Sequence, residues 1–156
     1  MTASFRDVVL LFPCAVVLHV VEEWPGFPRW ARRFASPRYS DRAYTITHAF
    51  AVTLALAVAL LLRAFQAPWL LFAFFAFVFG PGVLWNACFH AGASLASRTY
   101  CPGVATGLAV YLPLSLWLGA LALRDGLIAA PVLALALVVA AAFHTLEVGH
   151  NVFERW

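Results

Sequence analysis

His19, Glu22 and Glu23 lie within five residues of each other, at the end of a hydrophobic stretch that begins near Val8. In an α-helix, side chains three and four positions apart share a face, so the imidazole and both carboxylates can approach one point. Such groups are costly to bury in an apolar environment unless they are paired or bind an ion. The spacing therefore predicts metal ligands, and Glu22 and Glu23 are also candidate catalytic groups for proton transfer.

The same H-x-x-E spacing recurs near the C-terminus. The full set of candidate ligands comprises five histidines and three glutamates: His19, Glu22, Glu23, His48, His90, His144, Glu147 and His150. One zinc site needs only three or four ligands, so the larger set predicts two metal ions. Nitrogen and carboxylate ligands with little sulfur suit iron, zinc or manganese. The doubled H-x-x-E is the reverse of the E-x-x-H spacing of four-helix di-iron proteins, which favours iron, with zinc next.

Several of these ligands also have plainer interpretations. An intramembrane histidine commonly forms a hydrogen bond between helices. Glu23 can accept a hydrogen bond from a ligating imidazole instead of binding the ion. His150 lies about 120° around a helix from His144 and can simply reach the membrane interface. Four other polar residues are expected to support the ligands by hydrogen bonding, namely Asn86, Asn151, Arg98 and Thr106.

The composition predicts that these residues are positioned by membrane-spanning helices. The 156 residues are 64% hydrophobic and 11% charged, whereas soluble domains are typically about 45–50% apolar and about 25% charged. Five hydrophobic segments come near the ~20 residues that a bilayer core requires, at about 5–23, 43–62, 67–90, 102–123 and 127–151. We therefore expect an all-α, polytopic membrane protein: a single domain, 1–156, in which a five-helix bundle carries an arginine-rich loop at 24–42.

Successive spans cross the membrane in opposite directions. With this alternation, each of the five histidines lies at the end of its segment that meets the same face of the membrane. The loops on that face also carry most of the ten arginines. This bias predicts that the polar site and the C-terminus face the cytoplasm, with the N-terminus outside, in an inner or cell membrane. The expected partners are the bilayer and a lipophilic small molecule; no nucleic-acid partner is expected, and the oligomeric state is left open.

Other features restrict the interpretation. The three cysteines, Cys14, Cys88 and Cys101, are too few and too scattered for a disulfide scaffold or a C-x-x-C zinc site. No removable signal peptide is expected. Gly80-Pro81-Gly82 interrupts the third segment and is compatible with either a kink or two separate helices.

Three motifs occur in order along the chain: H-x-x-E-E at 19–23, N-x-x-x-H at 86–90 and Y-x-P-G-x-x-T at 100–106. Together they resemble the HXXEE-motif family of small integral membrane proteins. The matched positions are His19, Glu22, Glu23, Asn86, His90, Tyr100, Pro102, Gly103 and Thr106. The resemblance implies an uncharacterised membrane protein suspected of being an enzyme, and it implies no substrate.

The third motif also has a physical interpretation of its own. Pro102 suits the first turn of a helix, whose free N–H groups would point at the site and favour an anionic group there. Tyr100 is then a candidate catalytic residue that donates a hydrogen bond or a proton. The plainer alternative is a helix start beside an interfacial tyrosine.

These observations favour a membrane-embedded metalloenzyme with two metal ions that oxidises a lipophilic substrate, by hydroxylation or desaturation. One alternative is a zinc-dependent intramembrane hydrolase. Another is a non-enzymatic metal or haem protein, although haem does not require the buried glutamates. A transporter is disfavoured because the opposite face and the middle of the spans are nearly free of polar residues, and a scaffold would not need five histidines.

Overall fold

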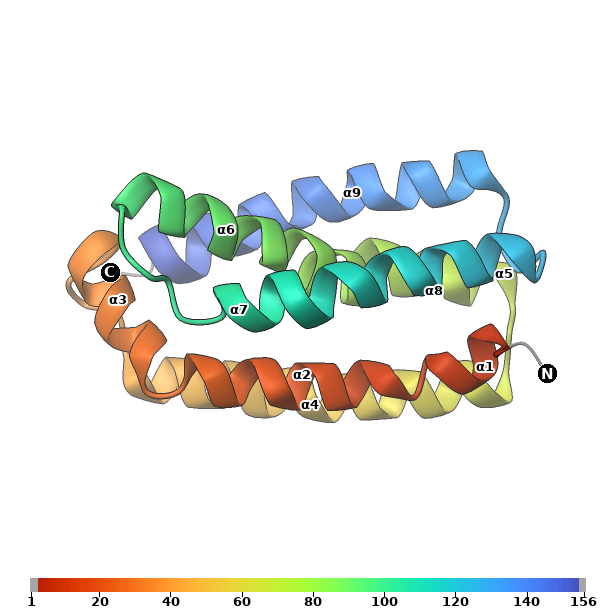
Figure 1. The fold of residues 1–156 in the computed structure, drawn as a ribbon, viewed down its shortest axis with the longest axis horizontal. Helices are drawn as coiled ribbons and strands as arrows, with labels where there is room; N and C mark the ends of the chain where they lie inside the picture. Colours follow the sequence, from red (N-terminus) through yellow and green to blue (C-terminus); the bar gives the residue numbers. More distant parts are fainter. Residues whose placement is uncertain (1–2, 155–156) are drawn as a thin grey trace.

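The computed structural model describes residues 3–154, and all regular secondary structure in this part of the chain is helical (Figure 1). The N-terminal third contains α1 (Phe5–Val8), α2 (Leu11–Glu23), α3 (Gly26–Phe34) and α4 (Asp41–Ala64). The middle contains α5 (Pro68–Ala73), the π-helical stretch η1 (Phe74–Trp85) and α6 (Asn86–Ser97). The C-terminal third contains α7 (Val104–Thr106), η2 (Gly107–Tyr111), α8 (Leu112–Arg124), α9 (Ala130–Val148) and η3 (Gly149–Glu154).

Four continuous helices are long and apolar enough to cross a membrane: Asp41–Ala64, Pro68–Ser97, Val104–Arg124 and Ala130–Val148. This confirms the all-α prediction and indicates an integral membrane protein. The predicted first span, 5–23, differs from the others because it is divided into α1 and α2. Although α2 has only 13 residues, it packs along α4, and with α1 it runs the length of the bundle (Figure 1).

Pro68–Ser97, the predicted third span, is one continuous helix. Gly80-Pro81-Gly82 therefore does not divide it into two helices. Pro81 has no N–H to donate, and the π-helical turns of η1 accommodate it without breaking the helix. Gly80 lies against α9 so closely that an added Cβ would be 2.5 Å from the Cβ of Ala140. The missing side chain therefore allows η1 and α9 to pack tightly along their lengths.

Several of the observed helix ends differ from the predicted ones, including both ends of the connection between the predicted third and fourth spans. The third span continues past His90 to Ser97, where Arg98 ends it in the left-handed conformation with φ 53°. The next helix starts at Val104 rather than Pro102, and Gly103 precedes it with φ 102°. The residues of the third motif thus form a turn that leads into the helix.

Aromatic side chains fill the centre of the bundle. Phe5, Phe12, Phe74, Phe75 and Phe79 are buried and make ring-to-ring contacts with one another. Since these residues come from α1, α2 and η1, they hold the N-terminal segment against the third span.

The end of the bundle that carries the N-terminus is fastened by two polar contacts. The Asp125 carboxylate accepts a hydrogen bond of 2.9 Å from the backbone N–H of Phe5. The Arg124 guanidinium donates one of 2.7 Å to the carbonyl of Ala3. These contacts fix the start of α1 to the connection between α8 and α9.

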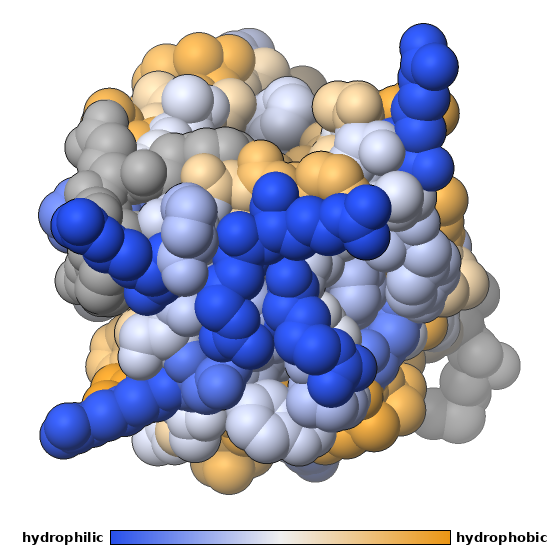
Figure 2. Space-filling model, turned by 90° about the vertical axis from the view of Figure 1, so that its left-hand side faces the viewer, coloured by the Kyte–Doolittle hydropathy of each residue, from blue (hydrophilic) through white to orange (hydrophobic). Residues whose placement is uncertain are grey.

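The opposite end is covered by α3 and the connection that follows it (Figure 1). A second buried cluster, Phe27, Trp30, Ala31, Tyr39, Tyr44, Cys101 and Val152, holds this cover in place. Its outer surface is strongly hydrophilic (Figure 2) and includes the exposed residues Arg29, Arg33, Arg38, Arg42 and Arg98. The arginine-rich loop is therefore largely helical, with apolar residues facing the bundle and arginines facing outward.

Candidate metal site

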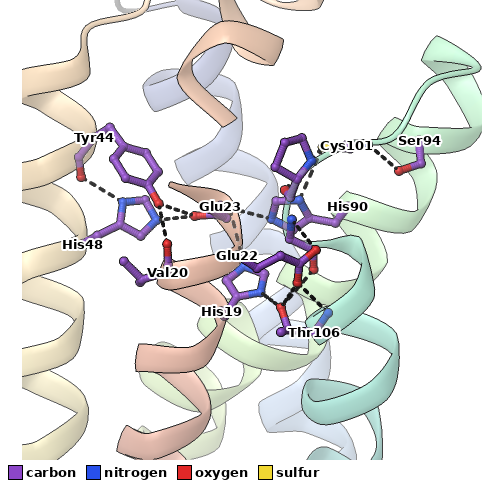
Figure 3. Close-up of polar contacts among 12 residues, drawn as sticks. His19, Val20, Glu22, Glu23, Tyr44, His48, His90, Ser94, Cys101 and Thr106 are labelled. Atoms are coloured by element: carbon purple, nitrogen blue, oxygen red, sulfur yellow. Dashed lines mark hydrogen bonds and ion pairs between the residues drawn. The ribbon is translucent and has the colours of Figure 1, made fainter. Parts of the chain in front are cut away.

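The Glu23 carboxylate lies at the centre of the site, with imidazoles from three helices around it (Figure 3). Its Oε1 atom is 3.0 Å from Nε2 of His90 and 3.5 Å from Nε2 of His19. Its Oε2 atom is 2.9 Å from Nε2 of His48 and accepts a hydrogen bond of 3.0 Å from the Tyr44 hydroxyl. Glu23 is only 2% exposed, so this carboxylate depends on its neighbours instead of water.

The hydrogen bonds of His48 determine which of its ring nitrogens carries the proton. Its Nδ1 is 2.8 Å from the carbonyl oxygen of Tyr44, one turn earlier on α4. A carbonyl only accepts, so Nδ1 must donate, and in the neutral ring Nε2 then presents a lone pair. The Tyr44 ring stacks on this imidazole with the centroids 3.9 Å apart, which holds its orientation.

His19 is held in the same way by Thr106. Its Nδ1 is 2.8 Å from the Thr106 hydroxyl oxygen, and that hydroxyl donates its own proton to Glu22. The threonine oxygen is therefore an acceptor for Nδ1–H, and Nε2 of the neutral ring is unprotonated. Stacking on Tyr111, at 4.4 Å between centroids, fixes the plane of the His19 ring.

His90 is fully buried and approaches Cys101 with its Nδ1, 3.4 Å from the sulfur. The Cys101 thiol also lies 3.8 Å from the carbonyl of Pro102, to which it can donate. When it does so, its sulfur can accept from Nδ1–H and leave the lone pair of His90 on Nε2. Burial raises the pKa of the Cys101 thiol to about 12, so the sulfur carries its proton at neutral pH.

The centre of the arrangement offers a place for one positive charge. Within residues 3–154, Nε2 of His19 and Nε2 of His90 are buried without a hydrogen-bond partner. The Glu23 carboxylate can be balanced by one protonated ring or by a cation bound to the lone pairs of neutral rings. His19, Glu23 and His90 each offer a ligand atom within 4.8 Å of the others. These three residues could therefore hold a metal ion, which would satisfy both nitrogens and the carboxylate together.

Glu22 points to the other side of α2, where it meets the N-terminal turn of the fourth span (Figure 3). Its carboxylate accepts hydrogen bonds from the backbone N–H groups of Gly103, Ala105 and Thr106, at 2.9, 3.0 and 2.6 Å. The hydroxyls of Tyr100 and Thr106 donate to it as well. The structure thus places Glu22 away from the three imidazoles, on the free N–H groups where sequence analysis expected an anion.

The hydrogen bond to Glu22 raises the pKa of Tyr100 to about 12. Tyr100 is 59% exposed, and its hydroxyl contacts the outer side of the Glu22 carboxylate. The H-x-x-E-E and Y-x-P-G-x-x-T motifs are therefore joined physically, and Thr106 connects them onward to His19.

Gly103 is required at its position for two reasons. Its φ of 102° is unfavourable for residues with a side chain. A Cβ there would also be 2.7 Å from Cε1 of His90 and 2.8 Å from Cε1 of His19. The turn between the third and fourth spans thus packs directly against the two imidazoles.

A cavity of about 360 Å³ adjoins the site and contains the remaining inward-facing candidates. His19, Glu23, His48, Asn86, His90, His144 and Glu147 all line it. Both ring nitrogens of His144, and Oδ1 of Asn86, are buried without a hydrogen-bond partner among the described residues. His144 and Glu147 come from α9, so four helices (α2, α4, α6 and α9) contribute these polar groups to one cavity.

Other predicted site residues lie elsewhere. His150, in η3, is exposed, and Arg98 is exposed at the end of α6. The side chain of Asn151 falls outside the described part of the structure. Neither His150 nor Arg98 is among the described residues that line the cavity.

Three contacts of the candidate ligands are not predicted by the sequence patterns. Tyr44 bonds to Glu23, Cys101 approaches His90, and Tyr111 stacks on His19. The position of Tyr44 could have been predicted from its spacing, because it lies four residues before His48 on one helix face. Cys101 was dismissed because its spacing from the other cysteines was wrong, although a thiol can meet a histidine from another segment.

The family comparison agrees with these motifs. A family model described as HXXEE, protein of unknown function with HXXEE motif, matches residues 10–118, which include all three. No curated protein and no solved structure shows significant similarity to the chain.

Proposed function

The chain belongs to the HXXEE family of proteins of unknown function, and we propose that His19, Glu23 and His90 bind a transition-metal ion that acts on a lipophilic substrate. Two imidazoles and one carboxylate are the ligand set of both non-haem iron oxygenases and zinc hydrolases. The observation that carries the proposal is the pair of buried Nε2 atoms that lie 3.0 and 3.5 Å from one carboxylate oxygen and form no hydrogen bond among the described residues.

A second metal position is supported by the other oxygen of Glu23. His48 faces Oε2, and His144 and Glu147 line the same cavity. Both nitrogens of His144 lack a partner among the described residues, although this side chain is 9% exposed. Glu23 would then bridge two ions, with His19 and His90 on one and His48 on the other.

Oxidation is the reaction class that we favour. Iron bound in this way would supply redox chemistry with dioxygen, which dissolves well in lipid, and an external electron donor would provide the reducing equivalents. The protein groups would orient the substrate and exclude water. Tyr111 and Phe27 lie against His19 and His90 and also line the cavity, so aromatic rings would shield the ligands from water on that side.

The hydrolase alternative uses the same ligands with zinc. Glu147 is the candidate general base in that case, because it lines the cavity, whereas both oxygens of Glu22 are taken up by hydrogen bonds. Glu22 and Tyr100 would serve either reaction by holding Thr106, and through it the His19 ring.

We further propose that α1 and α2 complete a five-span bundle whose arginine-bearing end faces the cytoplasm. Among residues 3–154, five arginines are exposed at that end, and the positive-inside tendency would then place the N-terminus outside.

Metal analysis of the protein purified in detergent from metal-replete cells tests the proposal. We expect iron at one to two equivalents per chain, and less than a tenth of that in Glu23→Gln and His90→Ala. His150→Ala is the matched control, because it removes an exposed histidine near the same end and should retain the metal. Zinc in place of iron would reject oxidation in favour of hydrolysis. Equal metal contents in the wild type and His90→Ala would overturn the site itself.

A further inference from the structure

The cavity beside the candidate ligands changes from polar to apolar along the helix axes. Glu23 and Phe12 both line it from α2, and eleven residues of helix correspond to about 16 Å. His48 lies at the polar end on α4, whereas Leu54, six residues further along that helix, lies toward the apolar end. A bilayer core is ~30 Å thick, so the cavity is about as long as one leaflet of it.

The mouth of this cavity opens sideways, on the surface that the spans present to lipid. Among the lining residues, Phe50 on α4, Phe77 on η1 and Phe143 on α9 are 67, 47 and 43% exposed. All three lie within helices long and apolar enough to cross a membrane. Because α4 packs on α2 while α9 packs on η1, the opening lies between these two helix pairs.

The arginine-bearing end of the cavity is covered instead. Phe27, Tyr39 and Val152 line it there, and they belong to the buried cluster under α3. A molecule would therefore enter from the hydrocarbon region and not through the polar end surface.

We propose that the ligand is a single-chain amphiphile, bound with its polar end at the Glu23 site and its alkyl chain along the cavity toward Phe12. This orientation matches that of the surrounding lipids, whose polar ends face the same membrane surface and whose chains point to the bilayer centre. It rests on the proposed function, and it identifies the polar end of the substrate, not the middle of its chain, as the part that reaches the metal.

Straight-chain alkyl hydroxamic acids, from butyl to hexadecyl, are suitable probes because their head group chelates iron and zinc. Binding is measured by titration of metal-loaded protein in one detergent, so that partition into micelles is the same for every variant. Ala51 lines the cavity, and Ala51→Phe should block the chain path. Ala57 is exposed on the same helix and does not line the cavity, so Ala57→Phe is the matched control.

The butyl probe should bind equally well to the wild type and both variants, since it occupies only the polar end. The hexadecyl probe should bind at least tenfold more weakly to Ala51→Phe and unchanged to Ala57→Phe. Equal weakening at every chain length, or at none, would overturn the proposed orientation. Absence of metal from the wild-type protein would instead reject the metal site, so the two failures are distinguishable.

A second measurement covers the case in which Ala51→Phe does not fold. A hexadecyl hydroxamate carrying a diazirine at the end of its chain is photolysed with the wild-type protein in lipid nanodiscs. Labels on the segments around Phe12, Val16 and Leu54 would support the orientation. Labels only on the outer surfaces of α4 and α9 would overturn it.

Discussion

The Thr106 hydroxyl oxygen lies 2.8 Å from Nδ1 of His19 while donating its own proton to Glu22. Thr106→Val keeps the shape of the side chain but removes both hydrogen bonds. Because partners of this kind orient metal-ligating histidines, we expect metal affinity to fall about 10- to 100-fold. Competition with a chelator of known affinity gives the value.

Thr53→Val is the control for this substitution. The Thr53 hydroxyl donates a hydrogen bond to the carbonyl of Ala49 on the exposed face of α4, and Thr53 does not line the cavity that holds the ligands. Its metal affinity should equal that of the wild type, and an equal loss in both variants would contradict the role given to Thr106.

Gly103→Ala should abolish metal binding and lower the melting temperature. The new Cβ would be closer than 3 Å to both His90 and His19, at 2.7 and 2.8 Å from their Cε1 atoms, so one or both rings must move. Gly126→Ala separates this effect from backbone strain, since Gly126 also has a positive φ of 67° but nothing within 4 Å. That control should lose about 1–2 kcal/mol of stability and retain its metal; loss of metal from both would refute the steric explanation.

Tyr100 should titrate unusually late. Its phenol donates to Glu22 and has its pKa raised to about 12 from 10.0, so the neutral form is favoured in the folded protein. Its stabilising effect is therefore present below about pH 10 and is lost as the pH rises toward 12. The difference in ultraviolet absorbance between the wild type and Tyr100→Phe isolates this transition. In Glu22→Gln it should move to lower pH, and an unchanged midpoint would contradict the attribution.

The contact between Gly80 and Ala140 predicts a local requirement for glycine. Gly80→Ala would bring a Cβ to 2.5 Å from the Cβ of Ala140 and still closer to the carbonyl oxygen of Phe75 in its own helix, and should destabilise the fold by about 1–3 kcal/mol. Gly82→Ala, two residues away in the same helix, meets nothing within 4 Å and should be close to neutral. Thermal unfolding in detergent compares the two, and equal melting temperatures would argue against this helix packing.

Much of the architecture follows from hydrophobic patterning, because a span must satisfy its backbone hydrogen bonds internally. The four long helices were predictable on this basis, and the end-to-end order of antiparallel segments explains why His19, His48 and His90 meet at Glu23. The predicted ends of the segments were less accurate. The small residues after His90 continue the helix to Ser97, because Ala and Ser do not strongly favour a helix end.

Patterning could not assign the two glutamates to different surroundings. Both Glu22 and Glu23 share a helix end, but the 100° turn between adjacent residues sends one to the imidazoles and the other to the N–H groups after Gly103. Which of the two faces each partner depends on how α2 rotates against α4 and α7, a tertiary property that a helix-spacing argument does not contain.

The end opposite the histidines has a practical use in protein engineering. The connection at 65–67 joins two spans there and takes no part in the polar contacts that anchor the start of the chain. A fluorescent or affinity domain spliced into it would sit a whole membrane thickness from the ligands. The connection at 125–129 is the poorer choice, because Asp125 anchors Phe5 and any insertion there would pull on α1.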